Sequence, residues 1–269
     1  MTKEIHSIAD PKLHLEILTP QEVRRIHEAT LRIIEQVGVR FPSKKALEIW
    51  SAHGAQVDPG KEIVRAKPHL IEEALKKCPP VYTLAARDPA QDLLLDGNHV
   101  FVGTDGCGVE VLDIQSGRRR TSCLQDVAEI ARLADATPEV AFHWVPVSAQ
   151  DRPPATRGLH EIKAIWENSS KHVQTESIYH LAEARAAIEM AAALVGGRKM
   201  LRERPVLSLM QCSAPPLGHD GGSLDAALLA AEVGIPTGFM TMSACLTTGP
   251  ATLAGTLAVG NARRTPSMA

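Results

Sequence analysis

Acidic and polar side chains close several short apolar segments of this sequence, and they carry the chemistry that an active site needs. The carboxylates of Asp105 and Glu176 could neutralise a positive charge, and a cation pocket combines such carboxylates with aromatic faces. The amide of Gln211 and the hydroxyl of Thr241 offer hydrogen bonds, and His143 offers a proton shuttle. We therefore predict Asp105 and Glu176 as catalytic residues, and Gln211, Thr241 and His143 as substrate-binding residues.

Each of these residues also has a purely structural interpretation. Asp105 would support the turn at residues 103–108, and Glu176 would cap a helix. Gln211 and Thr241 would make ordinary hydrogen bonds at the rim of a barrel. His143 and Trp144 are neighbours on one strand, so only one of them can point into a barrel, and a buried core position for His143 stays open.

No metal ion is expected in this site. His143, Cys212 and Cys245 lie near strand ends, but they lack the local spacing that zinc ligands show. The five cysteines form no C-x-x-C pair, and the first residues contain no apolar secretory segment. Reduced thiols in the cytoplasm are the expected state.

The elements that must position these residues form one repeating pattern, in which each short apolar strand is followed by a helix. This pattern is typical of βαβ units in a parallel sheet. The predicted strands are Val100–Thr104, Val140–Val145, His172–Thr175, Val206–Met210 and Thr237–Thr241. The predicted helices are Leu124–Ala134, Glu161–Glu167, Leu181–Val195, Leu224–Val233 and about Pro250–Asn261.

Two α/β architectures fit this alternation of strands and helices, a doubly wound sheet and a TIM-type (β/α) barrel. The glycine-rich stretch 103–108 leads into a hairpin rather than a helix, which fails the dinucleotide-binding fingerprint. Polar residues at the strand ends are typical of barrel active sites. We predict an incomplete TIM-type barrel, with about five of eight βα units, and a chain truncated at its carboxyl end.

The remaining sequence predicts three segments. Residues 1–95 form a helical and hairpin region, which begins with a capping box from Thr19 to Glu22 and includes helices over Ser43–His53 and Pro68–Lys77. Residues 96–262 form the partial barrel. Residues 263–269 form a tail with no apolar period.

Composition excludes several classes of protein. The 269 residues are 44% hydrophobic, and no run approaches the length of a membrane span. A net charge of −2 offers no basic excess for phosphates, so a nucleic-acid partner is not expected.

With these motifs placed, the chain resembles the trimethylamine:corrinoid methyltransferase family, including its glycine-betaine-demethylating relatives. Five stretches in the right order carry the resemblance, which runs from about Leu18 to Ala262. They are Leu18–Val23, Ile33–Val39, Val111–Arg119 with Asp126-Val127, Ser213–Leu217 with His219-Asp220, and Met240–Ser243 with Thr247–Ala262.

The resemblance implies an enzyme that moves a methyl group from trimethylamine, or a related methylated amine, to the cobalt of a corrinoid protein. It implies a cognate corrinoid protein as partner, no cofactor held tightly by this chain, and a homo-oligomer. Asp105 and Glu176 would then face the amine. Three alternatives stay open: glycine betaine or another quaternary amine as substrate, a catalytically inactive truncated fragment, and an unrelated barrel lyase or aldolase. The last is disfavoured, because Lys171 begins a strand rather than ending one.

Overall fold

The computed structural model describes residues 4–9 and 16–268. The chain divides into two compact units, each built from separate stretches of sequence. The first unit contains Met1–Pro11, Pro80–Met210 and Leu229–Thr237. The second contains Lys12–Pro79, Gln211–Leu228 and Gly238–Ala269. The boundaries expected at residues 95 and 262 stay predictions.

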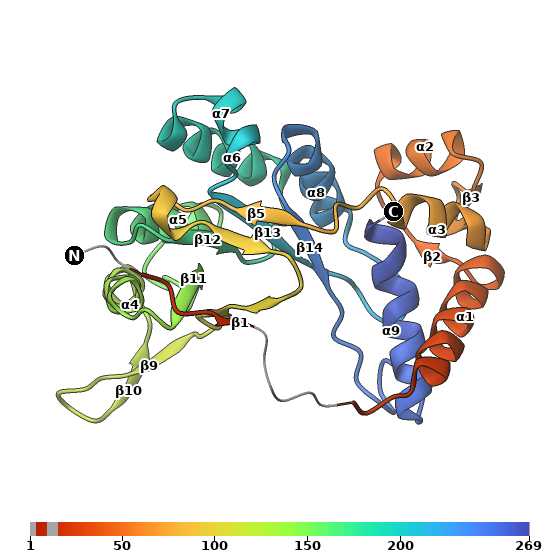
Figure 1. The fold of residues 1–269 in the computed structure, drawn as a ribbon, viewed down its shortest axis with the longest axis horizontal. Coiled ribbons are helices and arrows are strands. Elements are labelled where there is room, and N and C mark those ends of the chain that lie inside the picture. Colours follow the sequence, from red (N-terminus) through yellow and green to blue (C-terminus); the bar gives the residue numbers. More distant parts are fainter. Residues whose placement is uncertain (1–3, 10–15, 269) are drawn as a thin grey trace. The chain divides into compact units, whose positions relative to one another are not determined.

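A curled five-stranded sheet dominates the chain, in the order β14-β13-β12-β11-β8 (Figure 1). Its strands are β8 (Val102–Gly103), β11 (Val140–Trp144), β12 (His172–Thr175), β13 (Leu207–Cys212) and β14 (Thr237–Met240). The ladders β8–β11, β11–β12 and β12–β13 are parallel. The expected parallel α/β sheet is thereby confirmed, and its curled shape fits part of a TIM-type barrel. The first strand is shorter than expected, because Val100 pairs with Ile8 outside this sheet.

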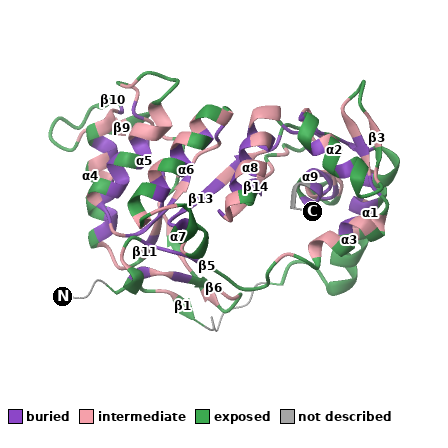
Figure 2. Ribbon diagram, turned by 90° about the horizontal axis from the view of Figure 1, so that it is seen from above, coloured by how far each residue is buried: buried purple, intermediate pink, exposed green. Residues whose placement is uncertain are grey.

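Helices follow these strands as the sequence predicted. They are α4 (Leu124–Ala136), α5 (Arg157–Asn168), α6 (Leu181–Val195), α7 (Arg198–Glu203), α8 (Gly221–Val233) and α9 (Leu253–Met268). In the first unit, α4, α5 and α6 each bury one face and expose the other (Figure 2). The last helix, α9, begins three residues after Pro250 and continues to Met268, where no helical pattern was expected. The short α7 was not predicted either.

Small antiparallel pairs complete the first unit. The pairs are β5 (Tyr82–Leu84) with β6 (Leu93–Leu95), β1 (Ile8–Ala9) with β7 (His99–Val100), and β9 (Glu110–Leu112) with β10 (Arg119–Thr121). A 3₁₀ turn, η1 (Pro89–Gln91), precedes β6. The β9–β10 hairpin, predicted to follow residues 103–108, extends away from the sheet (Figure 1).

Arg120 ties this hairpin to helix α4. Its guanidinium donates to both carboxylate oxygens of Asp126, at 2.8 and 2.7 Å. Asp126 also accepts the backbone N–H of Cys123 at 2.8 Å, which caps the helix. The Arg120 hydrogen bonds lower the pKa of Asp126 to about 2, so the pair stays ionised.

Lys171, which precedes β12, has a structural role. It is buried, and its Nζ donates to the carbonyl oxygens of Ala134, Thr137 and Val140, at 2.7, 2.8 and 2.5 Å. These carbonyls lie at the end of α4 and the start of β11, so the ammonium caps the helix and satisfies its last acceptors.

The second unit joins helices α1 (Pro20–Gln36), α2 (Lys44–Ala52) and α3 (Pro68–Leu75) to α9. The capping box predicted at Thr19 and Glu22 is present. The antiparallel sheet β2-β4-β3 was not predicted. Its strands, Val39–Arg40, Ile63–Arg65 and Gln56–Asp58, are too short to show a period.

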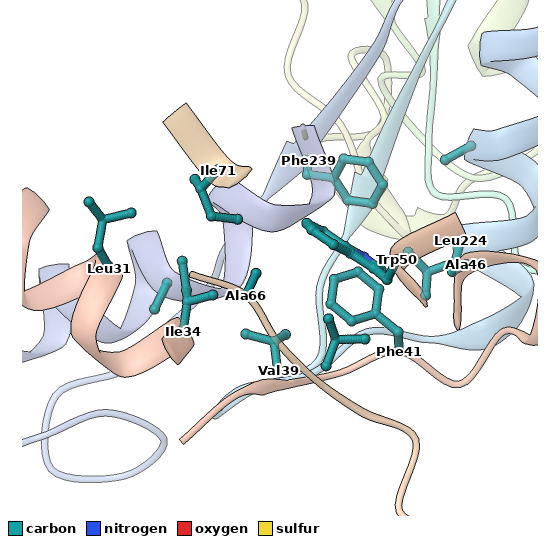
Figure 3. Packing of buried hydrophobic residues seen from close by; sticks show 13 residues of the cluster. Leu31, Ile34, Val39, Phe41, Ala46, Trp50, Ala66, Ile71, Leu224 and Phe239 are labelled. Carbon is teal, nitrogen blue, oxygen red and sulfur yellow. The ribbon is translucent and has the colours of Figure 1, made fainter. Parts of the chain in front are cut away.

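A continuous apolar core holds this unit together (Figure 3). Phe41 and Trp50 lie 5.8 Å apart between ring centroids, and Ile34 and Ile71 pack in the same cluster. Phe239, from β14, also joins it. The elements of the second unit therefore share one core although they come from distant parts of the sequence.

Candidate functional site

The turn after β8 leads to the candidate site in the first unit. Thr104 fastens this turn to β11, because its Oγ1 donates to the carbonyl of Trp144 and accepts the Trp144 backbone N–H at 2.9 Å. Farther along, Gly108 forms a parallel bridge with Val147. Residues 105–107 are thus held over the carboxyl end of β11.

Glu176 follows β12 directly and meets this turn. The thiol of Cys107 donates to Glu176 Oε2 at 3.1 Å. Glu176 Oε1 is buried and has no hydrogen-bond partner among the described residues, and the same holds for the indole Nε1 of Trp144. A Cβ at Gly106 would overlap Glu176 Oε1 and would lie 3.1 Å from Trp144 Nε1. The carboxylate and the indole therefore converge on the bare backbone of Gly106.

The surroundings of Glu176 disfavour its negative charge. Burial raises its pKa, and the negative charges of Glu161 and Asp105 raise it further. Hydrogen bonds from Cys107 act in the opposite direction. A cation bound beside Glu176 would relieve this cost, because an opposite charge favours the ionised carboxylate.

Two more carboxyls of the first unit belong to this acidic environment. Glu161, on α5, is buried and accepts the backbone N–H of Ala149 at 2.6 Å. Burial raises the pKa of Glu161 and also that of Glu183 on α6, and the negative charge of Glu161 raises the pKa of Glu183 further. Glu161 thereby anchors the loop after β11 as well as contributing charge.

Asp105 lies in the turn after β8, close enough for its charge to raise the pKa of Glu176. It is exposed, and its Oδ1 accepts the backbone N–H of Gly106 at 2.9 Å. It therefore supports the turn, as its structural interpretation requires, and its charge also acts on the pKa of Glu176. The structure brings the two residues predicted as catalytic into one electrostatic environment.

His143 lies in the core of the first unit. It is fully buried, its Nε2 lies 2.7 Å from Ser169 Oγ, and Ser169 donates in turn to Asp135 at 3.0 Å. Burial lowers the pKa of His143 to about 4, so it is neutral at pH 7. Because successive side chains of a strand alternate, Trp144 takes the other face of β11.

Gln211 and Thr241 belong to the second unit. Gln211 is fully buried, and its Oε1 accepts a hydrogen bond from Ser223 at 3.1 Å. Thr241 is half-buried, and its Oγ1 lies 3.5 Å from the position that a Cβ on Gly260 would take. Their roles in substrate binding stay predictions.

Sequence reasoning missed three residues beside Glu176: Gly106, Cys107 and Trp144. Gly106 and Cys107 lie in a turn whose glycine spacing was tested only against the dinucleotide fingerprint. Trp144 alternates with His143 on β11, so the period-two pattern marks the indole as the alternative to the imidazole.

No group of three or more His, Cys, Asp or Glu side chains that could hold a metal ion occurs in residues 4–9 and 16–268. Within the same described part of the chain, no helix has the length and apolar character needed to cross a bilayer.

Comparison of the sequence with known proteins identifies its family. A family model described as trimethylamine methyltransferase matches residues 1–269. The chain belongs to the trimethylamine methyltransferase family. The resemblance noted in the sequence is therefore confirmed, and the family is one of methyltransferases.

Several curated members of this family align with most of the chain. A trimethylamine methyltransferase from Desulfitobacterium hafniense (strain DSM 10664 / DCB-2) is 34% identical over 90% of this chain and 48% of its own length. A glycine betaine methyltransferase from D. hafniense (strain Y51) is 33% identical over 91% of this chain and 51% of its own. A trimethylamine methyltransferase from Methanosarcina thermophila is 28% identical over 93% and 53%. The chain thus spans about half the length of the curated relatives it matches.

Proposed function

We propose that this chain takes part in moving a methyl group from trimethylamine, or a related methylated amine, to the cobalt of a corrinoid protein. Family membership supports the reaction class. The observation that carries the assignment to a site is the buried Oε1 of Glu176, which lacks a hydrogen-bond partner in the described chain and lies beside the indole of Trp144.

The chemistry asks the protein to hold a positively charged nitrogen. A carboxylate in a partly dry site interacts with an ammonium far more strongly than it would in water. The indole adds an attractive aromatic face for the methylated cation. The methyl acceptor, a reduced corrinoid carried by another protein, is a second substrate that supplies the electron pair for the new bond.

In this proposal Glu176 binds and orients the amine. Burial raises its pKa, so the ionised carboxylate is disfavoured in the free site, and an arriving cation would offset that cost. Asp105 adds negative charge at the exposed edge of the same turn. In this proposal the five βα units form part of a TIM-type barrel. A cognate corrinoid protein as partner, assembly as a homo-oligomer and a cytoplasmic location complete it.

Glycine betaine is the second candidate substrate. The trimethylamine and glycine betaine enzymes of D. hafniense are 34% and 33% identical to this chain, which favours neither amine. Both substrates present a methylated nitrogen cation, so both suit a carboxylate with an aromatic face. They differ in the carboxylate of betaine, which Glu176 and Asp105 would repel.

Methyl transfer to free cob(I)alamin, followed by its absorption spectrum, tests the proposal. The purified 269-residue chain is assayed with trimethylamine and, separately, with glycine betaine, and the Glu176→Gln variant serves as the control. Turnover with one amine that falls at least about tenfold in Glu176→Gln supports the proposal and names the substrate. A folded chain without turnover for either amine contradicts it and favours an inactive fragment.

A further inference from the structure

Cys107 is held in an unusual backbone conformation beside Glu176. Its φ is +69°, in the left-handed region that non-glycine residues rarely adopt. Such a residue costs free energy unless its surroundings hold it in place, and strained residues of this kind gather at functional sites. The anchors on either side are the Thr104 hydrogen bonds to β11 and the bridge between Gly108 and Val147.

In this conformation the side chain of Cys107 is directed at the Glu176 carboxylate. The Cys107 thiol points at Glu176 and donates to Oε2 at 3.1 Å, while Gly106 presents bare backbone to Oε1. One carboxylate oxygen is thereby engaged, and the other stays buried without a partner among the described residues.

We propose that Cys107 is a positioning residue, whose thiol fixes the orientation of the Glu176 carboxylate and keeps it ionisable for an incoming methylated ammonium ion. This inference rests on the proposed function for its ligand, but the contact between thiol and carboxylate can be tested without any amine. A donor to the charged form of a carboxylate favours that form. The negative charges of Glu161 and Asp105 raise the pKa of Glu176, and the hydrogen bonds from Cys107 lower it. Cys107 is therefore the group that offsets these charges.

The first test follows the titration of Glu176 by NMR of chains labelled with ¹³C at the glutamate carboxyl, with Glu176→Gln used to assign the signal. Removal of the thiol in Cys107→Ala raises the pKa of Glu176, and Cys107→Ser, which retains a donor, restores it towards the wild-type value. Cys245→Ala is the matched control, because this other exposed cysteine lies in the second unit. An unchanged Glu176 titration in Cys107→Ala would overturn the proposal.

The variant Cys107→Gly is included in case Cys107→Ala fails to fold. Glycine accepts the left-handed conformation without strain, so this variant keeps the turn while lacking the thiol. It should show the same raised pKa as Cys107→Ala. A wild-type titration in a folded Cys107→Gly chain would overturn the proposal equally.

The second test measures the binding of trimethylammonium chloride to the same chains by calorimetry. Cys107→Ala should weaken binding about three- to tenfold near neutral pH. The loss should shrink at higher pH, where Glu176 is ionised with or without the thiol. A purely structural role would give a loss that does not depend on pH, and that result would overturn the proposal.

The two tests separate this inference from the proposed function. If wild-type chain binds no trimethylammonium while the Glu176 titration still responds to Cys107, the amine assignment fails and the positioning role stands. If binding occurs and the titration does not respond, the positioning role fails and the amine assignment stands.

Discussion

The core of the second unit and the turn over Glu176 in the first unit differ in the contacts of their polar side chains. In the core, Ser43 donates to Asp225 at 2.6 Å, and His219 Nε2 lies 3.1 Å from the carbonyl of Arg263. At the turn, Glu176 Oε1 and Trp144 Nε1 are buried without hydrogen-bond partners in the described chain. A buried polar group without a partner costs stability, and a ligand that supplied the missing interaction would offset that cost.

Side chains of the core stabilise the fold, whereas side chains at the turn are available to contact a ligand. The two tryptophans Trp50 and Trp144 show this contrast. Trp50 is buried against Phe41 in the apolar cluster, whereas Trp144 is half-buried at a strand end, beside a carboxylate and a glycine backbone. Substitutions in the first region should change stability, and substitutions in the second should change amine binding.

The largest expected effect comes from the apolar core. Trp50→Ala should lower the free energy of unfolding by about 3–5 kcal/mol, because it removes a large buried ring and leaves a cavity beside Phe41. Urea denaturation followed by circular dichroism measures the change. A loss under about 1 kcal/mol would mean that this cluster does not stabilise the second unit.

The pH dependence of stability should follow the buried histidines. His219 lies between Phe41 and Phe239, and burial lowers its pKa to about 4, against 6.5 when unfolded. Between pH 6.5 and 4 the unfolded chain therefore binds more protons, so stability falls as the pH falls, by about 3 kcal/mol for this residue.

The variant His219→Gln isolates this contribution, because an amide can still donate to the carbonyl of Arg263. Its unfolding free energy should depend less steeply on pH between 6.5 and 4 than that of the wild type, when both are measured by urea denaturation. Equal slopes would show that His219 titrates normally. Glu161, Glu176 and Glu183, whose pKa values are raised, contribute the opposite sign above pH 4.5 in both proteins, and the comparison removes them.

A methyl group placed at the turn should affect binding more than folding. Gly106→Ala puts a Cβ onto Glu176 Oε1 and so displaces the carboxylate, which should weaken trimethylammonium binding about tenfold, or about 1.4 kcal/mol. Gly60→Ala is the matched control, since its Cβ would meet only Asp58 at 3.6 Å, an ordinary contact. Calorimetry on both variants checks the prediction, and equal affinities would refute the role of Gly106.

The smallest effect is expected from Trp144→Phe. This change keeps an aromatic face and removes a buried N–H that has no partner among the described residues, so stability should stay the same or rise by up to about 1 kcal/mol. Amine binding should weaken a few-fold, because indole is the better face for a cation. Thermal unfolding and calorimetry together measure both changes. A marked loss of stability would place Trp144 with the core residues instead.

The sequence predicted the elements that repeat and missed those that depend on distant partners. The strands from Val140 and His172 and the helix from Leu181 were recognisable, because each carries several turns or alternations of pattern. The short strand β2 (Val39–Arg40) was not, because it is stabilised by pairing with β4 rather than by its own residues. The predicted incomplete barrel, with about five of eight βα units, agrees with the curled sheet of five strands.

The candidate site was predictable to a similar extent. Asp105 and Glu176 were predicted as candidates because carboxylates at strand ends lie at one edge of a parallel sheet, and their catalytic role stays a prediction. Cys107 was not, because its contact with Glu176 depends on a left-handed backbone conformation that spacing does not reveal. His143 and Trp144 stayed alternatives, since alternation fixes their relationship and only tertiary packing fixes which one faces the core.

Binding of a methylated ammonium ion by Glu176 is the property on which the proposed function depends. It is measured by calorimetric titration of trimethylammonium chloride into the wild-type chain and into Glu176→Gln, at a pH where Glu176 of the wild type is ionised. We expect saturable binding to the wild type that is weakened at least about tenfold in Glu176→Gln, which keeps the shape of the side chain and removes its charge. Equal affinity of the two chains for the cation would show that Glu176 does not bind it.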